Sequence, residues 1–315
     1  MTLFSKNFTE ISQNDVATAG GKGASLGEMI SIGLPVPPGF VVLASAFDHF
    51  MAETDLRVEV EAILKRVNHE DIYSVERASK KLRALIANVE FPEGLVEVVW
   101  SEFRDLAAQY VAVRSSATAE DSSTASWAGE LETFLNTTED NLLEAIKKCW
   151  SSLFTPRAIF YRFEKKLVEK KISVAVVVQK MVQAEVAGIC FTVHPVTQAE
   201  NQLIIEAGYG LGEAVVSGSI TPDSYVVNKN DWSILDVNIT KQSEKLVRRQ
   251  TGVESVAVPK IDQTKQKLTN QQIIELAQLA KKVEDHYGFP CDIEWALKGV
   301  KFYLTQSRPI TTLKD

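Results

Sequence analysis

Residues 291–310 read CDIEWALKGVKFYLTQSRPI, and this stretch decides how the rest of the chain is interpreted. The pattern predicts two short strands around a turn at Lys298-Gly299. In the first strand the alternation separates two sets of side chains, Ile293, Trp295 and Leu297 on one face and Asp292, Glu294 and Ala296 on the other. In the second strand it places four side chains on one face, Phe302, Leu304, Gln306 and Arg308. The stretch therefore predicts a β-hairpin that brings polar groups into a largely apolar sheet.

A carboxylate, an amide and a guanidinium are expected close together in this hairpin. Burying such groups is costly unless a charged ligand or a metal joins them. Glu294 and Gln306 offer the oxygen donors that Mg²⁺ prefers, and Arg308 offers a bidentate grip on phosphate. A magnesium nucleotide suits this set, whereas the alternative is an ordinary hairpin with a surface ion pair between Glu294 and Arg308.

The metal hypothesis makes a demand on the register of the hairpin. Glu294 and Gln306 share a face only if the numbers of paired residues sum to an even value, as when residue 294 lies opposite 304. An odd loop such as 298–300, or a β-bulge, meets this condition. A two-residue turn at Lys298-Gly299 in a regular ladder does not, and it would place the two side chains on opposite faces.

The composition is that of an ordinary globular protein, with 315 residues, 45% hydrophobic and 24% charged, enough for two or three structural units. The formal net charge of -7 argues against a nucleic-acid-binding protein. Cys149, Cys190 and Cys291 have no paired spacing, which favours neither disulfides nor a zinc site and fits a reducing compartment. The start, MTLFSKNFTEIS, lacks a signal-peptide core, and no apolar run reaches membrane-spanning length. We expect a cytoplasmic protein without membrane or nucleic-acid partners.

A glycine-rich turn opens into a predicted helix within residues 14–33, NDVATAGGKGASLGEMISIG. Glycines let the backbone approach a ligand closely, a helix start favours an anion, and Lys22 stands in the middle of the turn. The stretch is not a Walker A loop, because Val16 and Gly23 stand where that loop needs Gly and Ser or Thr. It is not a dinucleotide fingerprint either, because Leu26 replaces the third glycine. A phosphate contact and a plain connector both remain open.

Two further stretches fit a nucleotide site. Residues 110–113 predict a short strand that delivers Arg114 into the loop SSATAEDSSTASWAGE, whose hydroxyl and N–H groups suit phosphate. Residues 174–178 predict a central strand that leaves the core at Gln179-Lys180-Met181. Adenine commonly lies against such an edge and reads backbone N–H and C=O groups, with Met181 covering the ring. A mobile polar loop and a ligand-free core strand are the respective alternatives.

The remaining stretches indicate scaffold. Residues 45–109 predict helices, and residues 228–268 predict short peripheral strands and loops. The turn from Gly208 to Gly218 allows close backbone approach either to phosphate or to another domain, and the sequence does not choose between them. Thr269 begins a helix that stops at Gly288. The four histidines, His49, His69, His194 and His286, all lie in scaffold-like contexts.

Seven motifs, in this order, resemble the nucleotide-binding domain of the phosphoenolpyruvate synthase, pyruvate phosphate dikinase and rifamycin phosphotransferase family. They are GGKGASLGEM (20–29), GLPVPPGF (33–40), VRSSATAED (113–121), QKMV (179–182), GLGEAVVSG (210–218), DIEW (292–295) and QSRPIT (306–311). The resemblance covers essentially the whole chain. It implies an α+β fold of the ATP-grasp type, with ATP between two α+β subdomains that have mixed or antiparallel sheets. It also implies a helix-rich N-terminal subdomain at 1–109, a central subdomain with lid and adenine edge at 110–227, and a C-terminal subdomain with the metal hairpin at 228–315.

The resemblance further implies roles for individual residues. Lys22, Arg114 and Arg308 are similar to the phosphate-binding, catalytic residues of the family, Arg308 being on the terminal phosphates. The remaining nucleotide-binding positions are Gly129 and Thr133 in the lid, Gln179, Lys180 and Met181 at the adenine edge, and Asp292, Glu294 and Gln306 in the hairpin. Of these, Glu294 and Gln306 are the expected Mg²⁺ ligands, with Asp292 supporting them.

The lid departs from the family pattern. The family commonly has Phe followed by Ala-Gly-Gln, whereas this chain has Trp127, Ala128, Gly129 and Glu130. Tryptophan keeps an aromatic plug. The charge of Glu130 argues against a direct phosphate contact at that position.

The chemistry of the family implies partners. A histidine on a swivelling domain attacks the β-phosphorus of ATP, AMP leaves, and the phosphohistidine later serves an acceptor in a third domain. No glycine-flanked histidine motif of that type occurs in this chain. We therefore expect the ATP-activating half of a larger phosphotransferase, with the phosphohistidine and acceptor domains in a longer chain or a partner. Pyruvate is the expected acceptor; rifamycin phosphotransferase and a stand-alone, non-catalytic ATP-binding module are the alternatives.

Overall fold

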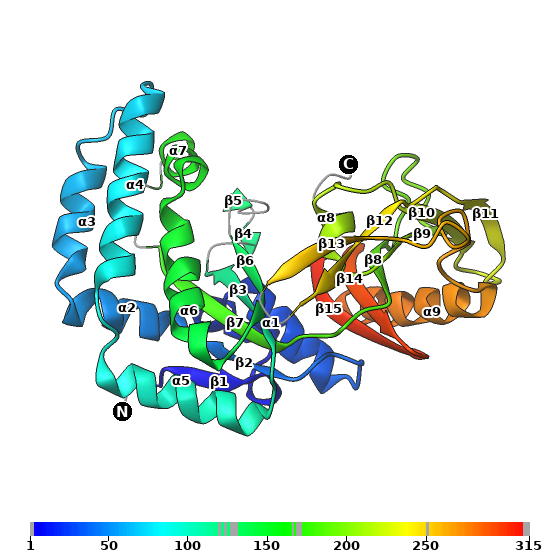
Figure 1. Ribbon diagram of the computed structural model, residues 1–315, viewed down its shortest axis with the longest axis horizontal. Helices are drawn as coiled ribbons and strands as arrows, with labels where there is room; N and C mark the ends of the chain where they lie inside the picture. The colour runs from blue at the N-terminus through cyan, green and yellow to red at the C-terminus, as the bar shows by residue number, and fades with distance from the viewer. Residues whose placement is uncertain are drawn as a thin grey trace. The chain divides into compact units, whose positions relative to one another are not determined.

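The computed structural model describes residues 3–118, 121–122, 125–126, 132–165, 167, 172–249 and 252–310. The chain forms two compact units. Unit 1 comprises Met1–Glu28 and Pro38–Met181, and unit 2 comprises Met29–Pro37 and Val182–Asp315. In each unit helices pack against an antiparallel sheet, which confirms the predicted α+β class (Figure 1). The three segments 1–109, 110–227 and 228–315 stay a prediction about functional parts of the chain.

The sheet of unit 1 has five antiparallel strands in the order β1-β2-β7-β3-β6. These strands are β1 Ser5–Asn7, β2 Gly39–Val42, β7 Val174–Lys180, β3 Val111–Ala117 and β6 Thr133–Thr137. The apolar run from Val174 to Val178 is fully buried in the centre of the sheet, as a continuous β-branched stretch predicts. A separate pair, β4 Asp121–Ser122 and β5 Ala125–Ser126, follows β3 along the chain.

Helices make up most of the remainder of unit 1. They are α1 Val16–Ser31, which runs into unit 2 at its end, α2 Ala44–Glu53, α3 Leu56–Leu64, α4 Ile72–Asn88, α5 Glu93–Leu106, α6 Leu142–Ser151 and α7 Pro156–Glu164. Short 3-10 turns lie at Phe8–Glu10, Gln13–Asp15, Glu139–Asn141 and Ser152–Phe154. The helices predicted within residues 45–109 are confirmed. Trp150 of α6 is fully buried among the rings of Phe47, Phe50 and Phe91, and this aromatic cluster packs the helices on one face of the sheet.

Strand β3 is longer than the sequence predicted. We expected the strand to end at Val113 and to deliver Arg114 into a loop, but it continues to Ala117 with every residue buried. Pairing explains the difference, because Arg114, Ser115 and Ser116 lie opposite residues of β7 in the middle of the sheet. Tertiary pairing has overridden the weak strand propensity of the serine-rich segment.

The sheet of unit 2 has six antiparallel strands in the order β11-β10-β9-β8-β14-β15. They are β11 Ile234–Asn238, β10 Asp223–Asn228, β9 Gln202–Tyr209, β8 Val186–Phe191, β14 Cys291–Lys298 and β15 Lys301–Pro309. A two-stranded ribbon, β12 Glu244–Arg248 with β13 Val253–Ala257, and the short helix α8 Glu213–Val216 complete the unit with α9. Helix α9, Asn270–Tyr287, begins at the Thr269–Gln272 capping box and ends at Gly288, as predicted.

The β14–β15 hairpin is confirmed, with two differences from expectation. Its two-residue turn is Gly299-Val300 rather than Lys298-Gly299, because Lys298 pairs with Lys301. The ladder also shifts register, since Trp295 lies opposite Leu304 whereas Glu294 lies opposite Gln306. Thr305 is therefore an extra, bulged residue. Phe302 and Leu304 face the same side as Trp295, and Gln306 and Arg308 face the opposite side, so the prediction that all four share a face is wrong.

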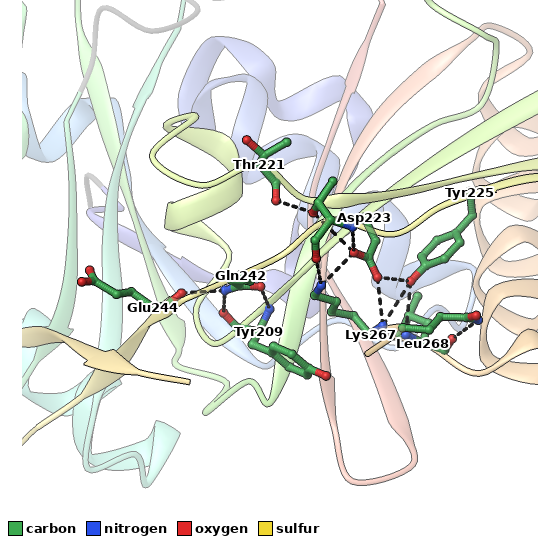
Figure 2. Close-up of polar contacts among 10 residues, drawn as sticks. Tyr209, Thr221, Asp223, Tyr225, Gln242, Glu244, Lys267 and Leu268 are labelled. Carbon is green, nitrogen blue, oxygen red and sulfur yellow. Dashed lines mark hydrogen bonds and ion pairs between the residues drawn. The ribbon is translucent and has the colours of Figure 1, made fainter. Parts of the chain in front are cut away.

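A buried polar network ties the irregular segment 239–268 of unit 2 to the sheet (Figure 2). The ion pair between Lys267 Nζ and Asp223 Oδ1, 2.8 Å long, has no exposed side-chain surface. Asp223 also accepts hydrogen bonds from the Tyr225 hydroxyl and from the backbone N–H groups of Thr240 and Lys267. Burial, followed by the charge of Asp223, raises the pKa of Tyr225 above its usual range. Residues 228–268 were predicted to be peripheral strands and loops, and within them Thr240 and Lys267 are bound to Asp223 of β10 by these polar contacts.

The helices of the described residues include none that is long and apolar enough to cross a membrane.

Candidate functional site

The glycine-rich turn of unit 1 is a break inside helix α1. Gly20 has φ 70° and ψ 169°, a conformation that only glycine adopts readily. A Cβ built on Gly20 would lie 2.2 Å from Ser116 Oγ and 2.4 Å from the Ser116 carbonyl oxygen. Ser116 Oγ donates to the Ala19 carbonyl and accepts from the Gly23 N–H, so this serine caps the helix where it restarts. Lys22 lies in that first turn, half-buried.

One face of the unit 1 sheet gathers several predicted residues. Arg114 lies directly opposite Thr133 on β6 and Val177 on β7, and Gln179 lies two residues further along β7. Because opposed residues share a face and alternate residues return to it, Arg114, Thr133 and Gln179 all point to the same side. Helix α1 covers this side, since its Gly23 approaches Val41, which is opposite Val177. Arg114 and Gln179 are buried, with 9% and 2% of their surface exposed.

Two backbone N–H groups at the predicted adenine edge already have hydrogen-bond acceptors within unit 1. The N–H of Lys180 donates to the Pro38 carbonyl and that of Met181 donates to the Tyr110 carbonyl. Met181 Sδ also accepts from the Asn136 N–H, which holds the side chain near the edge. These two N–H groups are therefore already bonded within unit 1, and Met181 is half-buried. The adenine edge at Gln179, Lys180 and Met181 stays a prediction.

The polar residues of unit 2 gather on one face of its sheet. Glu294 lies directly opposite Gln306, and Asp292 lies directly opposite Arg308. The four side chains consequently share the face that turns away from Trp295 and Ile293, which are buried. The β-bulge at Thr305 meets the register condition that a shared metal site demands.

Asp292 holds Arg308 in place. The Arg308 Nε and Nη2 atoms lie 2.8 and 2.7 Å from Asp292 Oδ2. Burial raises the pKa of the Asp292 carboxyl, Arg308 lowers it, and Glu294 raises it further. Asp292 Oδ1 is buried and has no hydrogen-bond partner among the described residues. This orphaned oxygen indicates a missing cation or donor, because buried polar atoms are normally paired.

The donor set fits Mg²⁺ that is shared with phosphate. A carboxylate and an amide oxygen, from Glu294 and Gln306, stand side by side on adjacent strands. Mg²⁺ is usually held by one or two carboxylates together with phosphates and water. In the part of the chain that the structure describes, no three His, Cys, Asp or Glu side chains form a cluster suited to a metal ion. A purely protein-built metal cage is thus not part of the described structure.

The sequence did not single out two residues near these faces. Ser116 lies within the motif 113–121, but its capping of α1 depends on contact between segments almost a hundred residues apart. Glu206 on β9 lies opposite Ile189, which lies opposite Glu294, so Glu206 shares the polar face of unit 2. The alternation in LIIEA could have placed Glu206 opposite the apolar face, but not in line with Glu294.

The turn from Gly208 to Gly218 makes its close approach within unit 2. Gly210 has φ 91°, and a Cβ there would lie 2.3 Å from the Leu246 carbonyl oxygen on β12. The Gln242 side chain holds the turn, since its amide donates to the Tyr209 carbonyl and accepts from the Tyr209 N–H (Figure 2). At Gly210, therefore, the glycine is needed for packing against the ribbon.

The other predicted residues have plain outcomes. Gly129, with Trp127, Ala128 and Glu130, lies outside the described residues, so its lid role stays a prediction. The histidines make packing contacts: His49 stacks on Phe4, His69 on Phe163, and His286 packs edge-on against Tyr287. His194 Nδ1 accepts the N–H groups of Val196 and Thr197. These contacts agree with the scaffold contexts expected from the sequence, and the role itself stays a prediction.

The sequence profile of the family described as pyruvate phosphate dikinase, AMP/ATP-binding domain, matches residues 16–315. The chain belongs to this family. The match includes Lys22, Arg114, Gln179 and the hairpin residues 292–308, so both polar faces lie within an AMP/ATP-binding domain. This confirms the family resemblance read from the motifs.

Relatives of this member of the dikinase family include phosphoenolpyruvate synthases and a rifampicin phosphotransferase. A probable phosphoenolpyruvate synthase of Methanocaldococcus jannaschii is 47% identical over 97% of this chain, and a phosphoenolpyruvate synthase of Pyrococcus furiosus is 39% identical over 99% of it. A rifampicin phosphotransferase of Bacillus cereus is 41% identical over 99% of the chain. The chain spans 26%, 44% and 36% of the length of these three relatives.

Proposed function

We propose that this chain binds Mg-ATP through an ATP-grasp fold and activates its β,γ-diphosphoryl group for transfer to a histidine on a separate domain, with release of AMP. The observation that carries the proposal is the hairpin register, which sets Glu294 opposite Gln306 and Arg308 opposite Asp292 on one face. Membership of an AMP/ATP-binding family supports the nucleotide. In this proposal, Lys22 and Arg114 of unit 1 are a second set of phosphate-binding groups.

In this proposal the chain's residues supply binding and electrostatic stabilisation. Lys22 and Arg114 of unit 1 bind phosphate oxygens, and Met181 packs against adenine. In unit 2, Arg308 is fixed by Asp292 Oδ2 before a ligand arrives, so little side-chain freedom is lost when it binds the terminal phosphates. Glu294 and Gln306 would hold Mg²⁺, which would offset the negative charge of the phosphates.

The transfer step needs charge stabilisation more than protein-based covalent chemistry. A histidine nitrogen forms a bond to the β-phosphorus, the bond from that phosphorus to the bridging oxygen of the α-phosphate breaks, and AMP leaves with the electron pair. Lys22, Arg114 and Arg308 offset the charge that develops. One cation about 4 Å from a phosphate charge contributes roughly 4 kcal/mol at an effective dielectric near 20, and less where water enters.

The phosphohistidine and acceptor domains are proposed to lie in a longer chain or a partner, since the relatives are longer. The test is to purify the gene product from its native cells and determine its intact mass. A mass well above 34.9 kDa, with AMP formed from ATP only when pyruvate is supplied, supports a phosphoenolpyruvate synthase. ATP consumption that yields no AMP would contradict the proposal.

Rifamycin is the second candidate acceptor, and the 41% identical rifampicin phosphotransferase is the observation that favours it. Expression of the full gene in a rifampicin-sensitive bacterium separates the two acceptors. Growth in rifampicin, lost in the Arg308→Ala variant, supports the antibiotic as acceptor. Sensitivity equal to that of the vector control rules it out.

A further inference from the structure

The start of strand β6 is bound to helix α4 by an ion pair. The Nη2 atom of Arg83, on α4, lies 2.9 Å from each of the two carboxylate oxygens of Glu132, the residue before Thr133. The two side chains are about one-third exposed, 35% for Arg83 and 31% for Glu132. Helix α4 belongs to the region 45–109 that the sequence indicated as scaffold. This contact therefore joins the scaffold to the edge of a predicted nucleotide-binding residue.

The backbone of Glu132 is held as well. Its carbonyl oxygen accepts a hydrogen bond of 3.2 Å from the Ser115 N–H and one of 2.8 Å from Ser115 Oγ. Ser115 is only 1% exposed and lies opposite Val176 in the centre of the unit 1 sheet. Glu132 is thus bound through its carbonyl to the sheet and through its carboxylate to a helix.

Ser115 points to the helix-covered face of the sheet. It shares a face of β3 with Val113, since alternate residues of a strand point to the same side, and Val113 lies in one core cluster with Leu82 of α4. Arg114 and Thr133 are opposed to each other on β3 and β6 and point to the other side. The contacts of the helix-covered face therefore hold the two chain segments that carry this proposed phosphate-binding pair.

The effect of the ion pair is expected in position rather than in stability. A partly exposed ion pair contributes little to the free energy of unfolding, because solvent screens it. Thr133 begins β6 and is itself exposed, so Glu132 is its nearest fixed neighbour on the N-terminal side. A displacement of about 1 Å is enough to impair ligand binding, since hydrogen bonds weaken steeply as distance and angle depart from the optimum.

We propose that Arg83 is a positioning residue for ATP, which fixes Thr133 opposite Arg114 by binding the carboxylate of Glu132. The inference rests on the proposed function, because it requires Thr133 to bind a phosphate oxygen of ATP. Arg83 acts through Glu132 and makes no contact with the nucleotide.

The test is a double-mutant cycle on the ATP affinity of the whole chain, measured by calorimetric titration with Mg²⁺ present. Arg83→Met and Thr133→Val should each weaken ATP binding about fivefold, the effect of losing one hydrogen bond. The double variant should bind no more weakly than the weaker of the two single variants, because Arg83 acts through Thr133. Two independent effects would multiply instead.

Three further variants serve as controls. Arg83→Lys keeps the positive charge beside Glu132 and should retain most of the ATP affinity. Arg77→Met removes an exposed arginine from the same helix and should bind ATP as the wild type does. Glu132→Gln removes the charge from the other side of the pair without a change in size, and it should weaken ATP binding in the same direction as Arg83→Met.

Thermal melts and the cycle together decide the inference. Arg83→Met should melt close to the wild type, because the pair is partly exposed. Wild-type ATP affinity in Arg83→Met and Glu132→Gln, single effects that multiply, or a loss of affinity that only follows a large drop in melting temperature would each overturn the inference and leave the proposed function standing. A wild type that binds no ATP would overturn both.

Discussion

Glu294 and Gln306 lie directly opposite each other in the β14–β15 hairpin, and they do so because the ladder shifts register between Glu294 and Trp295. With the two-residue turn at Gly299-Val300, a regular ladder would set Glu294 opposite Thr305 and turn Gln306 to the buried face. The bulge thus lets β15 place Phe302 and Leu304 in the core before Thr305. After Thr305 it places Gln306 and Arg308, the proposed ligand-binding residues, on the opposite face.

Single-residue deletions in β15 test this register. Deleting Thr305 removes the extra residue and leaves Glu294 opposite Gln306, so we expect Mg²⁺-dependent ATP binding to persist. Deleting Ser307 forces either Arg308 or Gln306 onto the buried face, and we expect loss of ATP binding and a lower melting temperature. Calorimetric titration of both variants provides the measurement. Equal loss of ATP binding in the two variants would argue that the bulge does not determine which face of the sheet Gln306 and Arg308 occupy.

The break in helix α1 predicts unequal effects of two glycine substitutions. Gly20 and Gly33 both have positive φ, 70° and 77°, but only at Gly20 does a Cβ collide with another residue, Ser116. Gly33→Ala should cost roughly 1–2 kcal/mol from backbone strain alone. Gly20→Ala should cost more and weaken ATP binding, because Ser116 is backbone-fixed and Lys22 moves with the helix start. Urea unfolding and ATP titration of the pair measure both effects, and equal free energies of unfolding would contradict this account.

Local signals explain which parts of the fold the sequence predicted. Helix α9 is bounded by Thr269 and Gly288, whose capping depends on neighbouring residues, and both ends were predicted correctly. The end of β3 was missed because its pairing partners on β7 lie about sixty residues away. Composition alone made the serines after Arg114 look like a loop.

The sequence proposed the residues of the candidate site, whose roles stay predictions, but it did not predict the register that brings them together. The motifs identified Glu294, Gln306 and Arg308 as candidate residues. The period of two along a strand showed that Glu294 and Gln306 share a face only if the hairpin has a bulge or an odd loop. The pairing of β14 with its two neighbouring strands decides between a bulge and an odd loop, and no residue type in 301–306 predicts the bulge. Glu206 was missed for a related reason, since only the order of the strands places β9 in line with β14.

The buried Lys267–Asp223 pair predicts a large stability effect with no ligand involved. Lys267→Met should lower the free energy of unfolding by about 3–5 kcal/mol, because Asp223 is left as a buried, uncompensated charge. Adding Asp223→Asn should recover part of the loss. Lys265→Met is the matched control, since its pair with Asp262 is exposed and its removal should leave the unfolding curve unchanged. Chemical denaturation measures all three; an unchanged Lys267→Met variant would show that the pair is dispensable.

The raised pKa of Glu206 predicts a pH dependence. The folded state holds the Glu206 proton at a higher pH than the unfolded state, whose value is near 4.5. Stability therefore falls as pH rises from 4.5 through the folded pKa, because the unfolded state then binds fewer protons. Glu206→Gln lacks this loss. In metal-free buffer, the melting temperature of Glu206→Gln minus that of the wild type should increase as pH rises from below 4.5 to neutral. A difference in melting temperature that does not change with pH would contradict a raised pKa of Glu206 in the folded state.

The most direct test of the central claim is calorimetric titration of the whole chain with ATP, with Mg²⁺ and with a chelator in its place. The account predicts one ATP per chain, with binding that depends on Mg²⁺ and is weakened at least tenfold by Lys22→Ala in unit 1 and by Arg308→Ala in unit 2. Both variants should remain folded, but Arg308→Ala should melt at a lower temperature, because it leaves the buried Asp292 carboxylate without its ion-pair partner. The exposed Lys298→Ala is the control and should bind as the wild type does. ATP affinity that ignores Mg²⁺, or that survives both substitutions, would contradict the account.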